Sequence, residues 1–124
     1  MGFVRTDAEE LPRHWGVSDV EGTLVIDEKY SEEPRDIRAG QSIFVIFVLH
    51  RSPGFSPAFL RQRSGHHGTE ASVLSTCSPI RFNPIGMSVL EVLGIRDANI
   101  DVGRLGMFDN TPILDIKPCI KNRL

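Results

Sequence analysis

An arginine and an asparagine lie close together in a proline-rich segment of the 124-residue chain: Arg81 and Asn83, between Pro79 and Pro84. Proline restricts the residue before it to extended backbone, so we expect an extended path with both side chains on one face. Gly86 follows, and a glycine permits a close backbone approach or a positive φ. A guanidinium beside a carboxamide suits an anionic or amide-bearing ligand. The alternative is a stiff turn in which Arg81 pairs with a surface acid.

A carboxylate and an ammonium group alternate in a second segment, after a stretch with turn composition at residues 109–112. The alternation from residue 113 to residue 117 predicts a half-buried strand with Ile113, Asp115 and Lys117 on one face. A carboxylate beside an ammonium group stays ionised, and it can orient a substrate or accept a hydrogen bond. The alternative is an exposed ion pair that contributes about 0 to 1 kcal/mol to stability.

Short elements must position these side chains, because 11 glycines and 8 prolines divide the chain into short segments. Hydrophobic patterning predicts strands at residues 22–26, 42–49, 87–93, 99–103 and 113–117. The apolar run from Ile43 to Leu49 does not alternate, so we expect a central strand covered on both faces. Gly94 is expected to follow the end of strand 87–93. Short helical turns are expected around Pro34 and at residues 57–62, the latter within a long loop from Ser52 to Ser75.

The composition, with 40% apolar and 24% charged residues, is typical of one globular domain over residues 1–124. The longest apolar run has seven residues, far fewer than the ~20 that a membrane span requires, so no membrane association is expected. The polar N-terminal stretch does not resemble a secretory signal. Two cysteines are too few for a disulfide framework. We therefore expect a cytoplasmic protein with Cys77 and Cys119 as free thiols.

The net charge of −2 argues against a generally basic nucleic-acid binder, but the charge is unevenly distributed. Residues 37–69 contain no acid and include Arg51, Arg61 and Arg63. Such a segment can attract a polyanion, or it can be a solvated loop with incidental arginines. His50, His66 and His67 in the same segment are a weak metal signal without a familiar ligand spacing, so no structural metal is expected.

The two polar segments resemble the two motifs of one family, the TsaA-like family, also called the YaeB or TrmO family. The first motif segment, residues 72–86, reads Ser-Val-Leu-Ser-Thr-Cys-Ser-Pro-Ile-Arg-Phe-Asn-Pro-Ile-Gly. It is similar to the family pattern Gly-(Val/Ala)-Phe-Ser-Thr-Arg-Ser-Pro-x-Arg-Pro-Asn-Pro-Ile-Gly. The second motif segment, residues 108–119, reads Phe-Asp-Asn-Thr-Pro-Ile-Leu-Asp-Ile-Lys-Pro-Cys. It is similar to the family pattern Leu-Asp-Gly-Thr-Pro-x-Leu-Asp-Ile-Lys-Pro-Tyr. Weaker similarity at residues 1–6 and 47–51 extends the resemblance over nearly the whole chain.

The resemblance implies a mostly β fold: a small, closed or partly open, mainly antiparallel β-barrel with few short helices, not a Rossmann fold. The chain agrees, because no Gly-x-Gly-x-x-Gly follows a predicted strand and strands do not alternate with helices. Members of the family are S-adenosylmethionine-dependent tRNA methyltransferases. The resemblance therefore implies a homodimer that binds S-adenosylmethionine in a cleft between the two segments. It also implies methyl transfer to N6 of an adenosine beside the tRNA anticodon that already carries a threonylcarbamoyl group.

The resemblance also suggests a role for each polar residue. Residues expected to contact the cofactor are Ser75, Arg81, Asn83, Pro84, Ile85, Gly86, Asp109, Thr111 and Leu114. Asp115 and Lys117 are expected to orient the substrate and accept its proton. Arg51, Arg61 and Arg63 are expected to contact tRNA phosphates.

Several residues depart from the family motifs, including Ser72 and Leu74 at the start of the first. Cys77, Phe82, Asn110 and Cys119 stand where the family has an arginine, a proline, a glycine and an aromatic residue. The departures at Cys77, Phe82 and Cys119 favour an alternative function, a cofactor-binding or interaction module of the same fold that does not methylate tRNA. Methylation of another small acceptor is a further alternative, and the slightly acidic net charge suits it.

Overall fold

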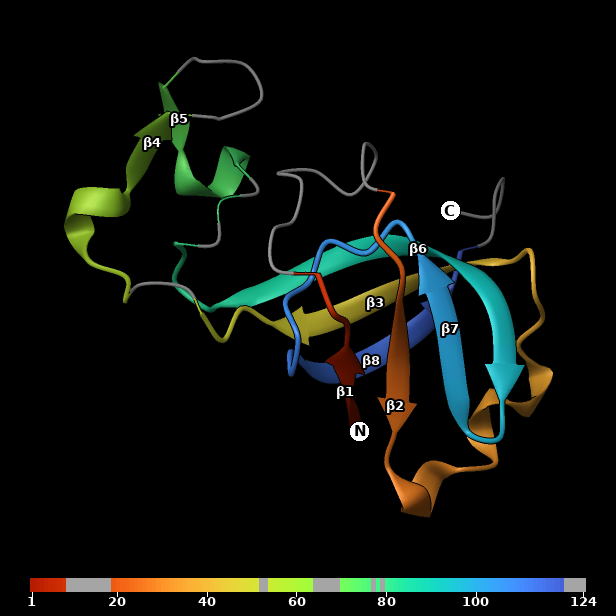
Figure 1. Cartoon of the computed structure of the whole chain (residues 1–124). Helices are drawn as coiled ribbons and strands as arrows, with labels where there is room; N and C mark the ends of the chain where they lie inside the picture. Colours follow the sequence, from red (N-terminus) through yellow and green to blue (C-terminus); the bar gives the residue numbers. More distant parts are fainter. Residues whose placement is uncertain (9–18, 52–53, 64–69, 77, 79, 120–124) are drawn as a thin grey trace.

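Six antiparallel strands form a ring in the computed structural model, which describes residues 1–8, 19–51, 54–63, 70–76, 78 and 80–119 (Figure 1). In ring order they are β1 (Gly2–Arg5), β2 (Gly22–Ile26), β7 (Asn99–Gly103), β6 (Ile85–Arg96), β3 (Ser42–Val48) and β8 (Pro112–Pro118). Strands β1 and β8 close the ring, with Gly2 opposite Ile113 and Phe3 opposite Pro112. The predicted fold, a mostly β antiparallel barrel, is therefore confirmed.

Apolar side chains from all six strands fill the inside of this ring. Successive side chains of a strand point to opposite faces, so every second residue of β3 is buried. Two residues that follow β7, Leu105 and Met107, add to the same core and are at most 1% exposed. The core consists of Val4, Leu24, Ile26, Ile43, Val45, Phe47, Leu90, Val92, Ile100, Val102, Leu105, Met107 and Ile113.

The central position predicted for residues 42–49 is confirmed, because β3 pairs with β6 on one side and with β8 on the other. The prediction that both of its faces are covered is wrong for the single chain. Phe44, Ile46 and Val48 lie on the outer face of the ring and are only half-buried. Burial therefore alternates along β3, but the sequence does not show this alternation because the residues on both faces are apolar.

Strand β6 is longer than the sequence predicts, since it begins at Ile85 and continues past Gly94 to Arg96. Its pairing with β7 shifts between Val92 and Gly94, which leaves Leu93 as an extra residue in a β-bulge. Gly94 therefore lies within the strand beside an irregularity in the ladder. The prediction that β6 ends before Gly94 is wrong.

A second bulge in β8 changes the faces predicted for the second motif segment. Phe47 of β3 lies opposite Ile113, but the next residue of β3, Ile46, lies opposite Asp115. Leu114 is the extra residue, so the alternation of faces is interrupted between Ile113 and Asp115. Ile113 is buried in the core, whereas Asp115 and Lys117 lie on the outer face, and the prediction that all three share a face is wrong.

The long loop predicted from Ser52 to Ser75 contains a small hairpin, β4 (Arg61–Arg63) with β5 (Glu70–Ser72). Figure 1 shows this hairpin beside the ring, beyond the end of β3 and the start of β6. Strand β1 was also not predicted. Strands β1, β4 and β5 have only three or four residues each, and β4 and β5 are largely polar. None of the three therefore shows a hydrophobic alternation long enough to predict a strand.

In the described part of the chain, the helical segments are single 3₁₀ turns: η2 (Glu28–Tyr30), η3 (Glu33–Asp36), η4 (Pro57–Phe59) and η5 (Val73–Ser75). The predicted turn around Pro34 is confirmed as η3, where Pro34 is buried. The turn predicted at residues 57–62 is shorter, because Arg61 already belongs to β4. Within the described ranges, none of the helices has the length and apolar character needed to cross a membrane.

Candidate functional site

The two motif segments flank β3 and meet at the end of the ring where that strand finishes. From there the second segment runs back along β3, so Lys117 lies opposite Phe44, near the start of that strand. Phe47 of β3 is opposite Gly86 of the first motif segment and opposite Ile113 of the second. Beyond the strand, the backbone N–H of Leu49 donates to the carbonyl of Pro84 over 2.6 Å. The fold therefore brings residues that are about 30 positions apart in the sequence to neighbouring strands of one sheet.

Residues of both segments share the outer face of this sheet. Ile46 of β3 has Met87 of β6 on one side and Asp115 of β8 on the other. Val48 lies opposite Ile85. Large apolar side chains are exposed here: Ile85 to 48%, Met87 to 60% and Leu114 to 47%. The outer face thus combines exposed apolar side chains with the charged residues of β8, and we call it the β6-β3-β8 face.

The two charges predicted to act together form an ion pair on this face. Lys117 Nζ lies 3.5 Å from Asp115 Oδ2, and the side chains are 62% and 55% exposed. Asp115 Oδ1 also accepts a hydrogen bond from the backbone N–H of Ile116 over 2.8 Å. An ion pair this exposed contributes little to folding stability. Stability therefore does not explain why the two charges lie side by side.

The stretch containing Arg81 and Asn83 is a bend and not the predicted extended path. Arg81 Nη1 donates to the carbonyls of Thr76 and Ser78, at 2.6 Å and 3.3 Å, and this curls the segment back on itself. Arg81 is half-buried and Asn83 is exposed. The guanidinium thus helps to hold the loop, and its remaining N–H groups are the ones that could meet a ligand.

Gly86 is close to a neighbouring group, as predicted, but that group belongs to the protein. A Cβ at this position would lie 2.5 Å from Cζ of Phe47. Phe47 is 6% exposed, so its ring is held in the core. The absence of a side chain at Gly86 therefore has a packing reason in the structure.

The turn predicted at residues 109–112 is confirmed, and its polar groups join it to other elements. Asp109 Oδ1 accepts from the backbone N–H of Thr6 over 2.9 Å, which attaches the turn to the end of β1. Thr111 is 2% exposed, and its hydroxyl donates to the carbonyl of Phe108 over 2.7 Å. His50 Nδ1 lies 3.4 Å from the same hydroxyl oxygen.

The arginines predicted to meet phosphates have different surroundings. The guanidinium of Arg51 lies 4.1 Å from the ring centroid of Phe108, in cation–π contact at the edge of the second motif segment. Arg61 Nε is 2.9 Å from Glu70 Oε1, so its charge is paired within the hairpin. The side chain of Arg63 lies outside the described residues. Of Arg51 and Arg61, Arg51 is therefore the one that contacts a motif segment.

The remaining predicted residues are a serine, the two cysteines and two histidines. Ser75 ends η5 and is exposed, and its hydroxyl lies 3.4 Å from that of Ser72. Cys119 is a free, half-buried thiol, as predicted, whereas Cys77 is outside the described residues. His66 and His67 are outside them as well. Among the residues described, His, Cys, Asp and Glu form no group of three that could hold a metal ion.

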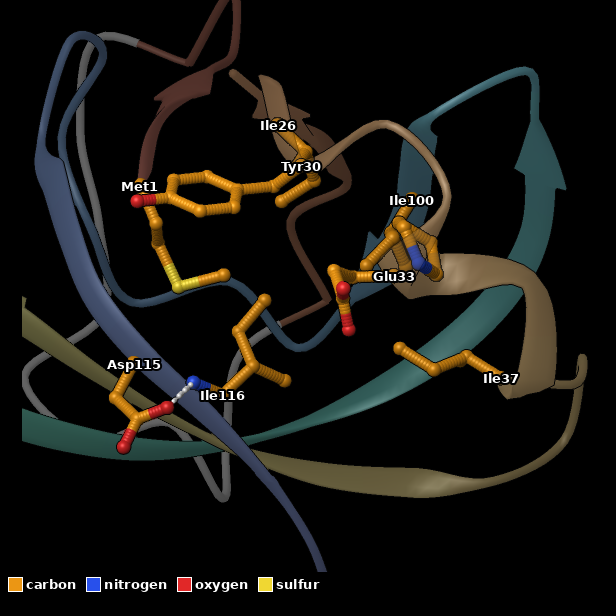
Figure 2. Close-up of a pocket in the computed structure, with 9 residues that line it drawn as sticks. Met1, Ile26, Tyr30, Glu33, Ile37, Ile100, Asp115 and Ile116 are labelled. Carbon is orange, nitrogen blue, oxygen red and sulfur yellow. Dashed lines mark hydrogen bonds between the residues drawn. The ribbon is translucent and has the colours of Figure 1, made fainter. Parts of the chain in front are cut away.

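A cavity of about 330 Å³ opens at the opposite end of the ring, between the 3₁₀ turns and the strand ends (Figure 2). It is lined by Met1, Ile26, Tyr30, Glu33, Pro34, Ile37, Ile100, Asp115 and Ile116. Figure 2 shows the carboxylate of Asp115 turned toward the N–H of Ile116 at the margin. A second hollow of about 510 Å³ involves Arg5, Glu21 and Asp101. Arg81, Asn83 and Lys117 line neither cavity, so their expected roles as ligand contacts stay predictions.

A family model described as the tRNA-methyltransferase O N-terminal domain matches residues 4–123. This chain belongs to that family. Over 130 aligned residues it is 32% identical to tRNA (adenine(37)-N6)-methyltransferase of Escherichia coli (strain K12), covering 95% of this chain and 55% of that protein. Over 125 residues it is 33% identical to VirR of Rhizobium radiobacter, described as a probable S-adenosyl-L-methionine-binding protein, covering 95% and 67%.

Solved structures of TrmO show the same fold. The structure from Pseudomonas aeruginosa superposes with a TM-score of 0.76 at 23% identity, covering 98% of this chain and 53% of that chain. The chain therefore spans a little over half the length of the E. coli relative and of this structure. The predicted TsaA-like, or TrmO, family is confirmed.

Two departures from the TrmO family motifs fit the local structure. Asn110 stands where the family motif has glycine, and its φ is +66°. Asparagine tolerates this left-handed region better than most residues, so the turn survives the change. Phe82 stands where the motif has proline, and its ring lies 4.5 Å from that of Phe55. Asn110 therefore suits its backbone conformation, and Phe82 packs against a second aromatic ring.

Sequence reasoning did not place two residues at this end of the ring. The sequence gives His50 only as a weak metal ligand and as part of a weak family similarity at residues 47–51, and Phe108 only as part of a motif. His50 and Thr111 are 61 positions apart, and a contact at that separation leaves no periodic signal in a single sequence.

Proposed function

We propose that this TrmO-type domain binds S-adenosylmethionine and transfers its methyl group to tRNA, at N6 of an adenosine beside the anticodon. The observation that carries the proposal is the juxtaposition of the two motif segments across β3. The printed functions of the relatives support it, because one is a tRNA (adenine(37)-N6)-methyltransferase and another a probable S-adenosyl-L-methionine-binding protein. We further propose that the adenosine already carries a threonylcarbamoyl group, as the resemblance implies.

The residues around β3 suit the chemistry of S-adenosylmethionine, which combines a flat purine, a sulfonium and an amino-acid group. Exposed Ile85 and Leu114 offer apolar surface for the purine. Lys117 and the free N–H groups of Arg81 can bind a carboxylate, and Asp115 can bind an ammonium group. Asn83, Pro84, Gly86, Asp109, Thr111 and Ser75 complete the proposed contact set. When bound, the cofactor supplies an electrophilic methyl group on sulfur.

The protein must position the acceptor and remove a proton. The carbamoyl group delocalises the lone pair of N6, which makes this nitrogen a poor nucleophile. Catalysis therefore depends on holding N6 in line with the sulfonium methyl, where proximity alone can lower the barrier substantially. The N6 proton must also pass to an acceptor. The exposed Asp115, oriented by Lys117, is one candidate acceptor.

A contact with tRNA phosphates is proposed for Arg51, with Arg61 and Arg63 further along the hairpin. Arg51 is exposed and its guanidinium is supported by the ring of Phe108 beside the second motif segment. Arginine on such a support loses little side-chain freedom when it binds a phosphate. We also propose, as the sequence predicts, that the protein acts on tRNA in the cytoplasm.

We propose that the working form is a homodimer in which a second copy covers the β6-β3-β8 face. Phe44, Ile46 and Val48 give this face an apolar centre, and Met87 and Leu114 extend it. Soluble monomers seldom expose large continuous apolar patches. A second copy would also exclude water from the charged residues at the edge of this face, Asp115 and Lys117.

Methyl transfer can be tested with the purified chain and S-adenosylmethionine labelled in its methyl group. We expect label in tRNA that contains threonylcarbamoyladenosine, at that nucleoside, and little label in the same tRNA made without the modification. Equal labelling of both tRNAs would contradict the threonylcarbamoyl requirement. Binding of the cofactor without transfer would support the alternative module, and label in a small molecule of a tRNA-free extract would support another acceptor.

A further inference from the structure

We propose that His50 accepts the N6 proton in the methyl transfer, an inference that rests on the proposed function. His50 follows the end of β3 by two residues, at the point where both motif segments meet. The preceding residue, Leu49, is bonded through its N–H to Pro84 of the first motif segment. The imidazole of His50 lies 3.4 Å, through Nδ1, from Thr111 Oγ1 of the second.

The surroundings of Thr111 determine which imidazole nitrogen of His50 carries the proton. The hydroxyl hydrogen of Thr111 is donated to the carbonyl of Phe108 over 2.7 Å. With its hydrogen directed to Phe108, the oxygen is left to accept a hydrogen bond from His50, which favours the tautomer protonated at Nδ1. In the neutral ring, Nε2 then carries the free lone pair. A buried threonine thus holds the imidazole in the tautomer that a proton acceptor at Nε2 requires.

His50 is exposed as a residue, so a bound substrate can approach its side chain. Two charged residues adjoin the contacting pair in the sequence: Arg51, next to His50, whose guanidinium is held over the Phe108 ring, and Asp109, two residues before Thr111, whose carboxylate accepts from the N–H of Thr6. Each of these charges is already engaged by another group. Arg51 could bind the phosphate next to the adenosine and so bring N6 toward the adjacent imidazole.

Asp115 is a weaker candidate for this step. Its Oδ1 accepts from the N–H of Ile116, and its Oδ2 is paired with Lys117. An imidazole near neutral pH is also a stronger base than a carboxylate. In the proposed step, the N6–CH₃ bond forms while the S–CH₃ bond breaks and S-adenosylhomocysteine leaves with the electron pair. The N6 proton passes to Nε2 of His50, and the imidazolium then releases it to water.

The tautomer can be tested without activity, by ¹⁵N NMR of the full chain with labelled histidine. We expect the His50 signals of a neutral imidazole protonated at Nδ1. The variant Thr111→Val, which removes the acceptor hydroxyl, should lose this preference. Protonation of His50 at Nε2 in the wild-type chain would overturn the proposal.

The catalytic role can be tested by single-turnover methyl transfer. His50→Asn keeps an N–H donor near the Nδ1 position but has no basic nitrogen, and we expect the rate to fall by about 10²-fold or more. Affinity for S-adenosylmethionine, measured by calorimetry, should stay within about threefold of wild type. Added imidazole should restore transfer in His50→Ala by at least about tenfold and should not restore it in Asp115→Asn.

The outcomes separate the two levels of the hypothesis. A wild-type chain that transfers methyl groups, with His50→Asn at the same rate, would remove His50 from the reaction and leave the proposed function intact. A lower rate without imidazole rescue, accompanied by weaker cofactor binding, would also overturn the role as proton acceptor. No transfer by the wild-type chain to modified tRNA would refute the proposed function, and the role of His50 with it.

Discussion

The backbone of Gly86 packs against the ring of Phe47, so even the methyl group of an alanine at this position should lower the stability of the fold. In Gly86→Ala, the new Cβ would lie 2.5 Å from Cζ and 2.7 Å from Cε2 of a ring that the core holds in place. Overpacking of this kind typically costs about 1 to 3 kcal/mol. We expect urea unfolding to show a loss of stability of this size.

The cause can be checked by shortening the neighbour of Gly86. Phe47→Leu alone should destabilise the core, but in combination with Gly86→Ala the two effects should be less than additive, because the clash is relieved. Strict additivity of the two free energies would show that contact with Phe47 is not the reason for glycine at this position.

Arg81 and Asp115 belong to different motif segments, and both are proposed to contact the cofactor. Single Arg81→Ala and Asp115→Ala variants should raise the dissociation constant for S-adenosylmethionine by about tenfold or more, or abolish turnover, while the chain stays folded. Calorimetric titration measures the affinity. The exposed Arg35→Ala, in η3, is a matched control that should bind normally. Unchanged affinity and turnover in both test variants would exclude these residues from the site.

At the scale of the elements, one carboxylate joins three strands of the ring. Asp101 of β7 accepts two hydrogen bonds from Arg96 of β6, at 2.7 Å and 2.9 Å, and one from Thr23 of β2 at 2.9 Å. The hydrogen bond from Arg96 is the main reason why the pKa of Asp101 is lower than usual. The carboxylate therefore binds a proton less readily in the folded chain than in the unfolded chain.

This shift predicts how stability depends on pH. The stabilisation is complete above the unfolded pKa of about 3.9 and is lost as the pH falls through the lower folded pKa. At pH 7 the wild-type chain should therefore resist urea better than Asp101→Asn, and the difference should shrink below about pH 4. Urea midpoints measured across this range test the prediction, and a difference that stays constant on acidification would contradict it.

The sequence predicts elements best where a strand has one apolar and one polar face. The bounds of β2 and β7 were predicted correctly, because both are short, rich in β-branched residues and flanked by polar ones. The bulges at Leu93 and Leu114 were not predicted, because an extra residue is defined only by the strand opposite it. The error in the face of Ile113 follows directly from the second bulge.

The candidate site was predicted as two segments, and their order in the sequence could not show how they are arranged. The motif resemblance identified residues 72–86 and 108–119, and the ring explains their proximity by placing β3 between them. The bend at Arg81 was missed because its cause is a hydrogen bond from a side chain to the backbone, which proline patterning does not reveal. The contact of His50 with Thr111 depends on tertiary structure for the same reason.

At the scale of the whole molecule, a second copy that covers the outer face of β3 would explain why this strand is apolar on both faces. Stable interfaces bury about 800 Å² on each partner, with an apolar centre and a polar rim. The β6-β3-β8 face has this arrangement, with Ile46 and Met87 at its centre and Asp115 and Lys117 beside them. The expectation of coverage on both faces of β3 would then hold for the dimer although it fails for one chain.

A charge placed at the centre of this face should therefore separate the subunits. Met87 is 60% exposed in the single chain, so Met87→Glu should fold normally, but its carboxylate would be desolvated in a dimer. We expect sedimentation equilibrium to give twice the 13.8 kDa chain mass for wild type and the single mass for Met87→Glu. Leu74→Glu, at a 78% exposed position in η5, is the matched control and should stay dimeric. A monomeric wild type, or a Met87→Glu variant that remains dimeric at micromolar concentration, would show that this face is not the interface.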